Sequence, residues 1–362
     1  MIFYQKILCD QFEKNSFLNN QSNDNYDFLN VLKKVNFHDL GLLYANIGLI
    51  QTLLQFIIEQ HWIKQKVNGQ KEINFQTFVT DLLKCELVLV PYLHPYLQRL
   101  TIGHLKKVNV KIKRMETQIL NYILQNENFE QKIFVTQVLC EISEYYEFEN
   151  QMQIEKEKIG EYLGLSFYRT FDNLDLIFNL NYASDLGMKI DLNLGERLYE
   201  GAGVGVQSGY STMLTALRYL NPEYGSRLID LGSGYGRLGF VVGLMRPDIK
   251  FFGYEYVSHR VASSLQTVQK FNLNEHTHFY TQDLAAKDFT IPDADIYYMY
   301  DPFSAETYKY VLNQLVEISR RQKIKIATKG NARFWLNDLA QQQGWESPYE
   351  LDNCNLCLYV SN

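Results

Sequence analysis

The stretch Arg227-Leu-Ile-Asp-Leu-Gly-Ser-Gly-Tyr-Gly-Arg-Leu-Gly-Phe-Val-Val-Gly243 decides the fold of the second half of the chain. It predicts a short buried strand over residues 227–231, then a glycine turn, then a helix. Glycines at 232, 234 and 236 remove the Cβ where a backbone must approach a ligand closely. The helix would point its N-terminus, with free N–H groups and the positive end of its dipole, into the same space. The stretch therefore predicts a site for a nucleotide-like cofactor.

A helical pattern precedes this stretch, and after it apolar strand patterns alternate with helical patterns. Further strands are expected at 250–254, 278–281, 295–300, 323–328, 347–351 and 355–360. Helices are expected at 211–220, 258–271, 305–320 and 332–342. This alternation predicts an α/β fold, with a mainly parallel sheet covered by helices on both faces. The tight connection between the last two strands predicts an antiparallel C-terminal hairpin.

The first half of the chain has a different pattern and predicts a mostly α-helical domain. Helical periodicity is expected over 37–66, 74–89, 111–124, 130–148 and 151–163. We expect a helical domain at 1–165 that recognises a substrate or covers the site, a junction at 166–199, and the α/β domain at 200–362. Two domains also suit 362 residues, at about 150 residues per domain.

Composition and charge exclude some classes of function. A net charge of −6 argues against a free-standing binder of duplex DNA. Five cysteines predict no disulfide framework. The pair Cys354 and Cys357 has no second Cys or His pair, so it predicts structural cysteines and no metal site. The N-terminus lacks a signal-peptide pattern, so a cytoplasmic location is expected. The apolar segment 41–58 predicts a buried or amphipathic helix and no membrane span.

Three acidic residues follow or end the first three predicted strands. Asp230 lies just before the glycine turn, Glu255 ends the second strand, and Asp283 follows the third. An acid at the end of the second strand is placed to accept hydrogen bonds from ribose hydroxyls. A carboxylate at Asp283 would accept a hydrogen bond from an adenine amino group.

A dinucleotide site is the first alternative to test, because residues 234–239 match GxGxxG. That match begins too late, since Gly232 already occupies the turn and Asp230 would crowd a pyrophosphate. The turn also has no basic residue set aside for phosphates. A carboxylate near the turn instead attracts a cationic amino-acid group. The pattern favours a ligand without phosphates.

Residues 200–362 resemble the class I S-adenosylmethionine (SAM)-dependent methyltransferases. The resemblance lies in the order of Asp230-Leu-Gly-Ser-Gly-Tyr-Gly236, Glu255, Asp283, the segment 301–303 and the terminal hairpin. It implies a seven-stranded Rossmann-like methyltransferase sheet and SAM as the cofactor. It further implies cofactor contacts at Asp230, Gly232, Ser233, Gly234 and Gly236 for the methionine part, at Glu255 and Tyr256 for the ribose, and at Asp283 and Leu284 for the adenine. The loop from Gln207 to Thr212 is expected to close over the methionine end.

The fourth strand ends in Asp301-Pro302-Phe303, where this family places residues that face its acceptor. Asp301 would act as a base or position the acceptor, Pro302 would fix the backbone, and Phe303 would offer a flat aromatic face. The segment resembles the Asp/Asn-Pro-Pro-aromatic motif of adenine-amine methyltransferases but lacks the second proline. The glycine stretch also resembles that of the non-SET histone-lysine methyltransferases.

Three hypotheses for the acceptor stay open. The first is a protein side chain, lysine before others, which reacts in an aromatic channel built from Tyr210, Phe303 and the tyrosines Tyr297, Tyr298 and Tyr300. The second is a nucleic-acid base, with contacts from the basic cluster Lys106, Lys107, Lys111, Lys113 and Arg114; a solvated helix face is the plain alternative for that cluster. The third is a non-catalytic interaction protein built on a cofactor fold. The sequence leaves the oligomeric state open.

Overall fold

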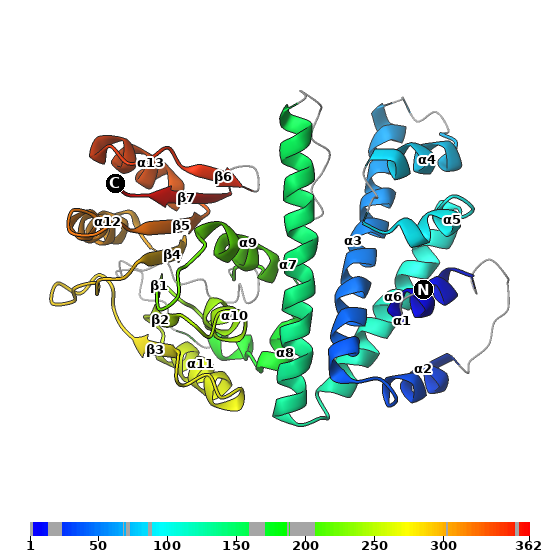
Figure 1. Ribbon diagram of the computed structural model, residues 1–362, viewed down its shortest axis with the longest axis horizontal. Helices are drawn as coiled ribbons and strands as arrows, with labels where there is room; N and C mark the ends of the chain where they lie inside the picture. Colours follow the sequence, from blue (N-terminus) through cyan, green and yellow to red (C-terminus); the bar gives the residue numbers. More distant parts are fainter. Residues whose placement is uncertain are drawn as a thin grey trace. The chain divides into compact units, whose positions relative to one another are not determined.

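The computed structural model describes residues 3–13, 24–67, 69, 73–85, 89–158, 171–186, 188, 207–301, 303–351 and 355–362. The chain divides into two compact units, Met1–Arg169 and Thr170–Asn362. Figure 1 shows the helices of the first unit from blue to green, and the sheet of the second unit from green to red. The junction expected at 166–199 is described only at 171–186 and 188.

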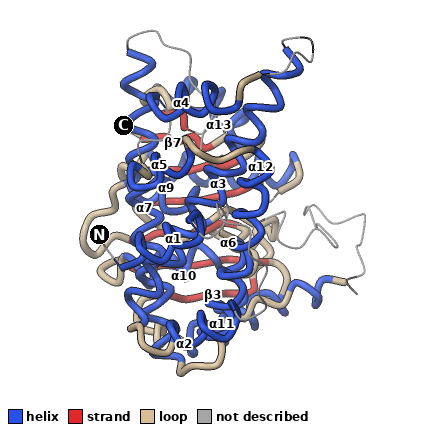
Figure 2. The backbone as a smooth tube through the Cα atoms, turned by 90° about the vertical axis from the view of Figure 1, so that its right-hand side faces the viewer, coloured by secondary structure: helices blue, strands red, loops and turns tan. Residues whose placement is uncertain are grey.

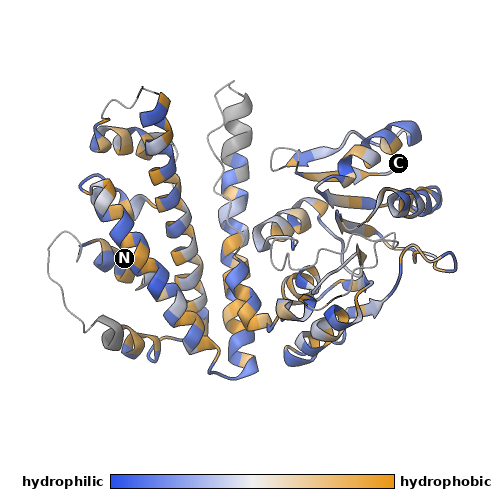
Figure 3. Cartoon of the chain, turned by 180° about the vertical axis from the view of Figure 1, so that it is seen from behind, coloured by the Kyte–Doolittle hydropathy of each residue, from blue (hydrophilic) through white to orange (hydrophobic). Residues whose placement is uncertain are grey.

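The described part of the first unit is helical. Its elements are α1 (Phe3–Glu13), α2 (Asp24–Leu32), α3 (Phe37–Val67), α4 (Phe75–Cys85), the 3-10 turn η1 (Pro91–Leu93), α5 (His94–Leu97), α6 (Ile102–Ile123) and α7 (Asn128–Lys158). Helix α3 packs against α6 and α7. Where burial in α7 is described, its buried apolar residues lie in the first half, which is mostly orange in Figure 3.

Helix α3 is long and apolar enough to cross a bilayer, but 78% of its apolar window is buried inside the protein. It also carries polar side chains toward the interior of the unit. Tyr44 and Gln51 donate hydrogen bonds of 3.3 and 2.8 Å to the buried carboxylate of Glu116 on α6. Such a helix is typical of the core of a helical domain, as the interrupted apolar segment 41–58 predicted.

Two helices of the first unit differ from the sequence prediction. Helix α6 begins at Ile102, because Thr101 caps it and His104 completes a reciprocal capping box. The helices predicted at 130–148 and 151–163 form one continuous helix, α7, up to Lys158, and residues 159–163 lie outside the described residues. The sequence places no glycine or proline between them, so nothing local ends the first helix.

The second unit contains the predicted seven-stranded sheet. The strands are β1 (Arg227–Leu231), β2 (Lys250–Glu255), β3 (Thr277–Thr281), β4 (Ile296–Tyr300), β5 (Lys325–Lys329), β6 (Tyr349–Leu351) and β7 (Leu356–Val360). They lie in the order β3-β2-β1-β4-β5-β7-β6, which Figure 2 shows as red strands stacked from β3 to β7. β7 alone runs antiparallel to both of its neighbours, β5 and β6, and the other pairs are parallel. The predicted fold class is confirmed.

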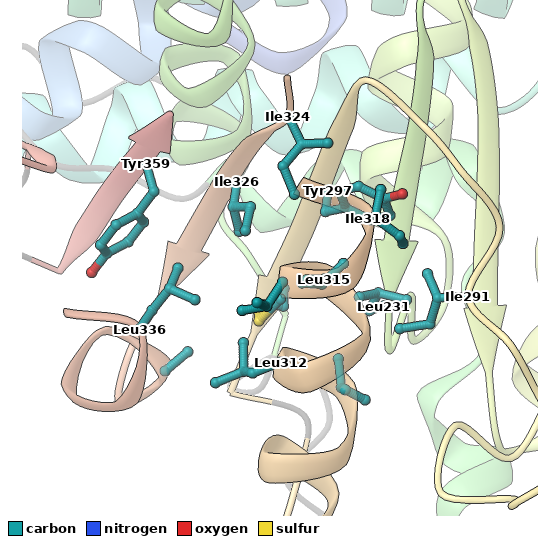
Figure 4. Packing of buried hydrophobic residues seen from close by; sticks show 14 of the residues in the cluster. Leu231, Ile291, Tyr297, Leu312, Leu315, Ile318, Ile324, Ile326, Leu336 and Tyr359 are labelled. Atoms are coloured by element: carbon teal, nitrogen blue, oxygen red, sulfur yellow. The ribbon is translucent and has the colours of Figure 1, made fainter. Parts of the chain in front are cut away.

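Helices cover both faces of this sheet. They are α9 (Tyr210–Leu220), α10 (Arg237–Met245), α11 (Ser258–Lys270), α12 (Ala305–Ser319) and α13 (Ala332–Gln343). α12 and α13 pack on one face, where Figure 4 shows Leu315 and Leu336 against Ile326 and Tyr359. α9, α10 and α11 contact the strands from the other face.

The register places the predicted site at the centre of the sheet. Asp230 of β1 pairs with Gly253 of β2 on one side and with Tyr298 of β4 on the other. Along the chain, β2 and β3 are added on one side of β1, whereas β4 and β5 are added on its other side. Ligands of open α/β sheets bind at such a switch point, outside the carboxyl ends of the strands.

Candidate functional site

The glycine turn after β1 is fixed by its own backbone. Gly232, Gly234 and Gly236 have φ values of 88°, 55° and 84°. The N–H groups of Gly232 and Ser233 both donate to the Tyr254 carbonyl oxygen at 2.9 Å. Other residues rarely adopt these positive φ values, so the conformation explains why the turn repeats glycine.

A Cβ would meet different neighbours at different glycines of the turn. A Cβ at Gly236 would lie 2.7 Å from Cζ of Phe279 and 2.7 Å from Oγ of Ser264. The missing Cβ of Gly236 therefore leaves room for side chains of β3 and α11, and its contact with a cofactor stays a prediction. A Cβ at Gly234 would lie 3.0 Å from Oε1 of Gln207. The side chain of Gln207 thus lies over the turn, where the sequence placed the covering loop.

Three other predicted cofactor residues have side chains that are buried. The Ser233 hydroxyl is buried, has no hydrogen-bond partner among the described residues and faces β2, where a Cβ on Gly253 would lie 2.8 Å from it. Thr212 is buried in the first turn of α9. Leu284 belongs to the hydrophobic core beneath the sheet. The cofactor contacts expected at Ser233 and Leu284 stay predictions, and they would have to come from the backbone of these residues.

Two buried carboxylates lie beside the turn. Asp230 is 5% exposed and Glu255 is 6% exposed. Glu255 accepts hydrogen bonds from the N–H of Gly234 at 2.8 Å and of Val257 at 2.9 Å. No described residue donates a hydrogen bond to the Asp230 side chain. The strand end therefore presents a buried acid to which none of the described residues donates.

Burial disfavours the ionised form of both acids and raises the pKa of each. Desolvation raises the pKa of Asp230 well above its usual value, and the nearby Glu255 raises it further. Desolvation also raises the pKa of Glu255, although Arg260 and the two backbone N–H groups oppose the shift. A cationic ligand beside Asp230 would remove the cost of burying its charge.

The arginine that follows the glycine turn is fully paired. Arg237 is 2% exposed and donates from Nε to Oδ1 of Asp175 at 2.9 Å, and from Nη2 to the other oxygen of the same carboxylate. Its Nη1 donates to Asp172 at 2.9 Å and to the Ser208 carbonyl oxygen at 3.0 Å. Asp172 lies in η2 (Asp172–Leu174) and Asp175 begins α8 (Asp175–Phe178). The guanidinium is thus neutralised by protein carboxylates and holds the backbone next to Gln207.

A second arginine is neutralised in the same way. Arg260 of α11 donates to both oxygens of Asp185 at 3.2 and 3.0 Å, and its Nη1 lies 3.7 Å from Oε1 of Glu255. Asp185 ends η3 (Tyr182–Asp185) and also binds His259 at 2.7 Å and the Tyr235 hydroxyl at 2.9 Å. Burial opposes ionisation of Asp185, but the hydrogen bonds from Arg260 and His259 outweigh it and lower its pKa.

These contacts define the electrostatics of the site. Both arginines next to the turn are held by carboxylates, so neither is set aside for a phosphate. The buried carboxylates of Asp230 and Glu255 favour a ligand that carries a positive charge or hydroxyl groups. The sequence analysis missed Asp172, Asp175 and Asp185, which lie in the segment it described only as a junction. A signal was present, because these three acids are the only charged residues in the sequence from 170 to 188.

Asp283 and Tyr256 lie at the ends of the neighbouring strands. Asp283 is partly exposed, and its Oδ1 accepts the N–H of Ala285 at 2.8 Å. Tyr256 directly follows β2 and is also partly exposed. Their side chains therefore stay accessible at the edge where the resemblance places ribose and adenine.

The end of β4 has an unusual backbone. Asp301 has a φ of 41°, in the left-handed region that a non-glycine residue rarely adopts. Its carboxylate accepts from the Tyr308 hydroxyl at 3.3 Å and from Nδ2 of Asn331 at 2.8 Å. Backbone strain of this kind clusters at functional sites. Asp301 is therefore held in one orientation at the carboxyl edge of the sheet.

Two of the other residues predicted for the acceptor side have different surroundings. Phe303 is fully buried in the hydrophobic core and makes an edge contact with Tyr308, with ring centroids 5.2 Å apart. Its expected role as an open aromatic face is corrected, because the turn at Asp301 sends the chain back into the core. Tyr210 is also fully buried, and its hydroxyl donates to Asp175 at 2.6 Å. Burial raises the pKa of that hydroxyl, so it suits the ion network and not proton transfer. Pro302 lies outside the described residues.

The tyrosines of β4 alternate as strand geometry predicts. Tyr297 points into the core and donates to the Pro292 carbonyl oxygen at 2.8 Å. Tyr298 lies on the other face and shares a 2.7 Å hydrogen bond with Ser208. Tyr300 ends the strand, and Nζ of the buried Lys329 lies 4.7 Å from the centre of its ring. Tyr300 is partly exposed and remains a candidate for an aromatic wall, whereas Tyr297 and Tyr298 are buried, at 0% and 2% exposed.

A metal centre finds no support in the described part of the chain. No group of three His, Cys, Asp or Glu side chains among those residues could hold a metal ion. Cys357 is buried in β7, and Cys354 lies outside the described residues.

Solved structures of methyltransferases are similar to part of this chain. No family model matches it, and no curated protein matches its sequence. Similar solved structures include a SAM-dependent O-methyltransferase from Thermotoga maritima, with 16% identity, a TM-score of 0.33, and coverage of 41% of this chain and 64% of that one. They also include TrmN from Thermus thermophilus, with 14% identity, a TM-score of 0.34, and coverage of 43% of this chain and 49% of that one. A third is an RNA methyltransferase from Salinibacter ruber in complex with S-adenosyl-L-homocysteine, with 14% identity, a TM-score of 0.33, and coverage of 43% of this chain and 92% of that one.

The chain spans 49% to 64% of the first three structures found. Scores and identities this low say nothing of activity or acceptor. The resemblance to histone-lysine methyltransferases stays a prediction.

Proposed function

We propose that the chain is a SAM-dependent methyltransferase. One observation carries the proposal: the carboxyl edge of the sheet presents the buried acids Asp230 and Glu255 while the adjacent Arg237 and Arg260 are already paired with Asp175 and Asp185. A dinucleotide would bring a pyrophosphate to this edge and would need donors or cations there. SAM carries no phosphate and has a cationic methionine part, so it suits the residues present.

Each acid has a separate part in this proposal. Asp230 would bind the cationic amino group, and Glu255 would accept hydrogen bonds from the ribose hydroxyls while it holds the Gly234 N–H. Asp283 would accept from the adenine amino group. Bound SAM supplies an electrophilic methyl group. Methyl transfer mainly needs the acceptor to be held in line. Asp301 is the residue we assign to that positioning, since Tyr308 and Asn331 fix its carboxylate.

For the acceptor, we propose a protein side chain, lysine first, as one of two classes. Tyr300 supports it, because it ends β4 with a partly exposed ring that would border a dry aromatic path. A lysine must lose its proton before it reacts, and a dry path lowers its pKa. The loss of Phe303 and Tyr210 from that path weakens the case.

A nucleic-acid acceptor is the second class, and the basic face of α6 favours it. Four of the five cations in the sequence cluster, Lys106, Lys107, Lys113 and Arg114, are exposed, and Lys111 is partly buried. A phosphate backbone pairs with such a face. A cytoplasmic location stays a prediction for either class.

Methyl-labelled SAM tests the function and the acceptor together. The protein is incubated with labelled SAM and separate pools of protein, RNA, DNA and metabolites, and an Asp301→Asn variant is run beside it. Label in one pool that falls at least tenfold with Asp301→Asn supports the proposal and names the class. SAM binding without transfer to any pool would favour the non-catalytic alternative.

A further inference from the structure

The solvent face of α6 is basic along much of its length. Its cations are Lys106, Lys107, Lys111, Lys113 and Arg114, all within nine residues. At 100° per residue they occupy an arc of about 160°, and the buried side chains of α6 fill the opposite side. The only acid of the helix, Glu116, is buried and bound to Tyr44 and Gln51. No acidic side chain of α6 therefore interrupts this face.

The charge of this face contrasts with the rest of the chain. Helix α6 carries five of the 35 Lys and Arg residues and one of the 41 Asp and Glu residues, which leaves it at +4 and the remainder at −10. No hydrogen bond or ion pair joins the five side chains to another described residue. A cationic patch that is isolated in an acidic chain raises the local concentration of anions and steers them to it.

The face suits a polyanion better than a protein or a lipid surface. Val110, 53% exposed, is the large apolar residue among the cations. Protein interfaces instead enrich aromatic residues and deplete lysine at their centre. A membrane-surface helix needs an exposed apolar face, but the apolar face of α6 is buried in the first unit. The face therefore presents a row of flexible cations about 12 Å long, since Lys106 and Arg114 are eight positions apart along the helix.

We propose that this face of α6 binds the phosphate backbone of a nucleic-acid strand. A row of that length faces about three to four successive phosphates of one strand. The inference rests on the proposed methyltransferase function and deepens it, because it selects nucleic acid, the second of the two proposed acceptor classes, as the substrate that the first unit binds. Phosphate contacts fix position and carry no sequence information, so the target base is selected elsewhere.

Fluorescence anisotropy with a labelled 20-nucleotide single-stranded RNA tests the inference on the full chain, and a DNA duplex of the same length runs in parallel. Three to four phosphate contacts predict a slope of log affinity against log salt of about −2 to −3 for the single strand. The double variant Lys106→Gln with Arg114→Gln should reduce the magnitude of that slope by about 1.4. The matched variant Lys33→Gln with Lys34→Gln, also exposed in the first unit, should change it by less than about 0.3.

Equal effects of the two double variants would overturn the proposal, as would affinity that does not change with salt. Tighter binding to an acidic peptide or to anionic vesicles would overturn it too. Glutamine preserves helix propensity, and circular dichroism checks that the variants stay folded. SAM binding is measured on the same samples. Unchanged SAM binding with weakened RNA binding supports both ideas, whereas RNA binding without SAM binding refutes the methyltransferase proposal alone.

Discussion

Asp175→Asn should lower the free energy of unfolding of the second unit by more than the substitution of a surface acid does. The Asp175 carboxylate accepts two hydrogen bonds from the guanidinium of Arg237 and one each from Tyr182, at 2.7 Å, and Tyr210, at 2.6 Å. Asparagine keeps the shape but removes the charge, so the buried arginine would retain Asp172 alone as an anionic partner. Breaking one side of a buried ion pair costs about 3–5 kcal/mol in free energy of unfolding.

The cost should appear as a large change in thermal stability. For a unit of this size, about 2–4 °C in Tm accompanies each kcal/mol, so a fall of about 6–20 °C is expected. Asp248→Asn is the matched control, because Asp248 pairs with Arg246 in the same unit and both side chains are 29% exposed. That pair should contribute less than about 1 kcal/mol. Calorimetry or chemical denaturation monitored by circular dichroism measures both variants.

Replacing both partners distinguishes charge burial from simple packing. Arg237→Met combined with Asp175→Leu removes the charges together and should recover most of the lost stability. The same double variant should still weaken SAM binding, because the Ser208 carbonyl next to Gln207 loses its Arg237 donor. If Asp175→Asn costs no more than Asp248→Asn, the ion network does not hold this part of the site together.

Other substitutions test the turn and its acids. Asp230→Asn should weaken SAM binding by about 10- to 150-fold, through loss of a hydrogen bond to a charged group of about 1.5–3 kcal/mol. Because burial raises the pKa of Asp230 and SAM needs its ionised form, affinity in the wild type should rise with pH through that pKa, and the variant should lose the dependence in calorimetric titrations. The raised pKa also means that the ionised acid destabilises the empty protein, so Asp230→Asn should raise Tm at neutral pH without cofactor; a fall would contradict this sign. Gly239→Ala should cost about 1–3 kcal/mol on denaturation, since its Cβ would lie 2.5 Å from Cζ of Phe279, whereas Gly103→Ala in α6, with 3.8 Å to its nearest atom, should be neutral or stabilising.

The sequence predicted the second unit closely because its signals are local. Strand and helix patterns alternate with clear breaks, and the glycine turn requires a left-handed backbone that the structure has at Gly232, Gly234 and Gly236. The first unit was less predictable at its ends. α6 begins with a capping box that uses His104 where glutamate or glutamine is usual, so its start gave a weak signal.

The site was predictable only where its residues follow strands. Asp230 and Glu255 could be placed from position alone. The ion network could not, because Asp175 and Arg237 are 62 residues apart and Asp185 and Arg260 are 75 apart, and no local pattern links them. Phe303 was misplaced because its direction depends on the left-handed backbone of Asp301. An aromatic residue after a strand looks the same in the sequence whether it faces a ligand or the core.

Equilibrium dialysis of labelled SAM tests the central claim most directly. We predict saturable binding of one SAM per chain, competition by S-adenosylhomocysteine, no competition by NAD, and a loss of about tenfold or more in affinity with Asp230→Asn. Absence of SAM binding to folded protein, or displacement of SAM by NAD, would contradict the claim that the acidic edge of this sheet is a SAM site.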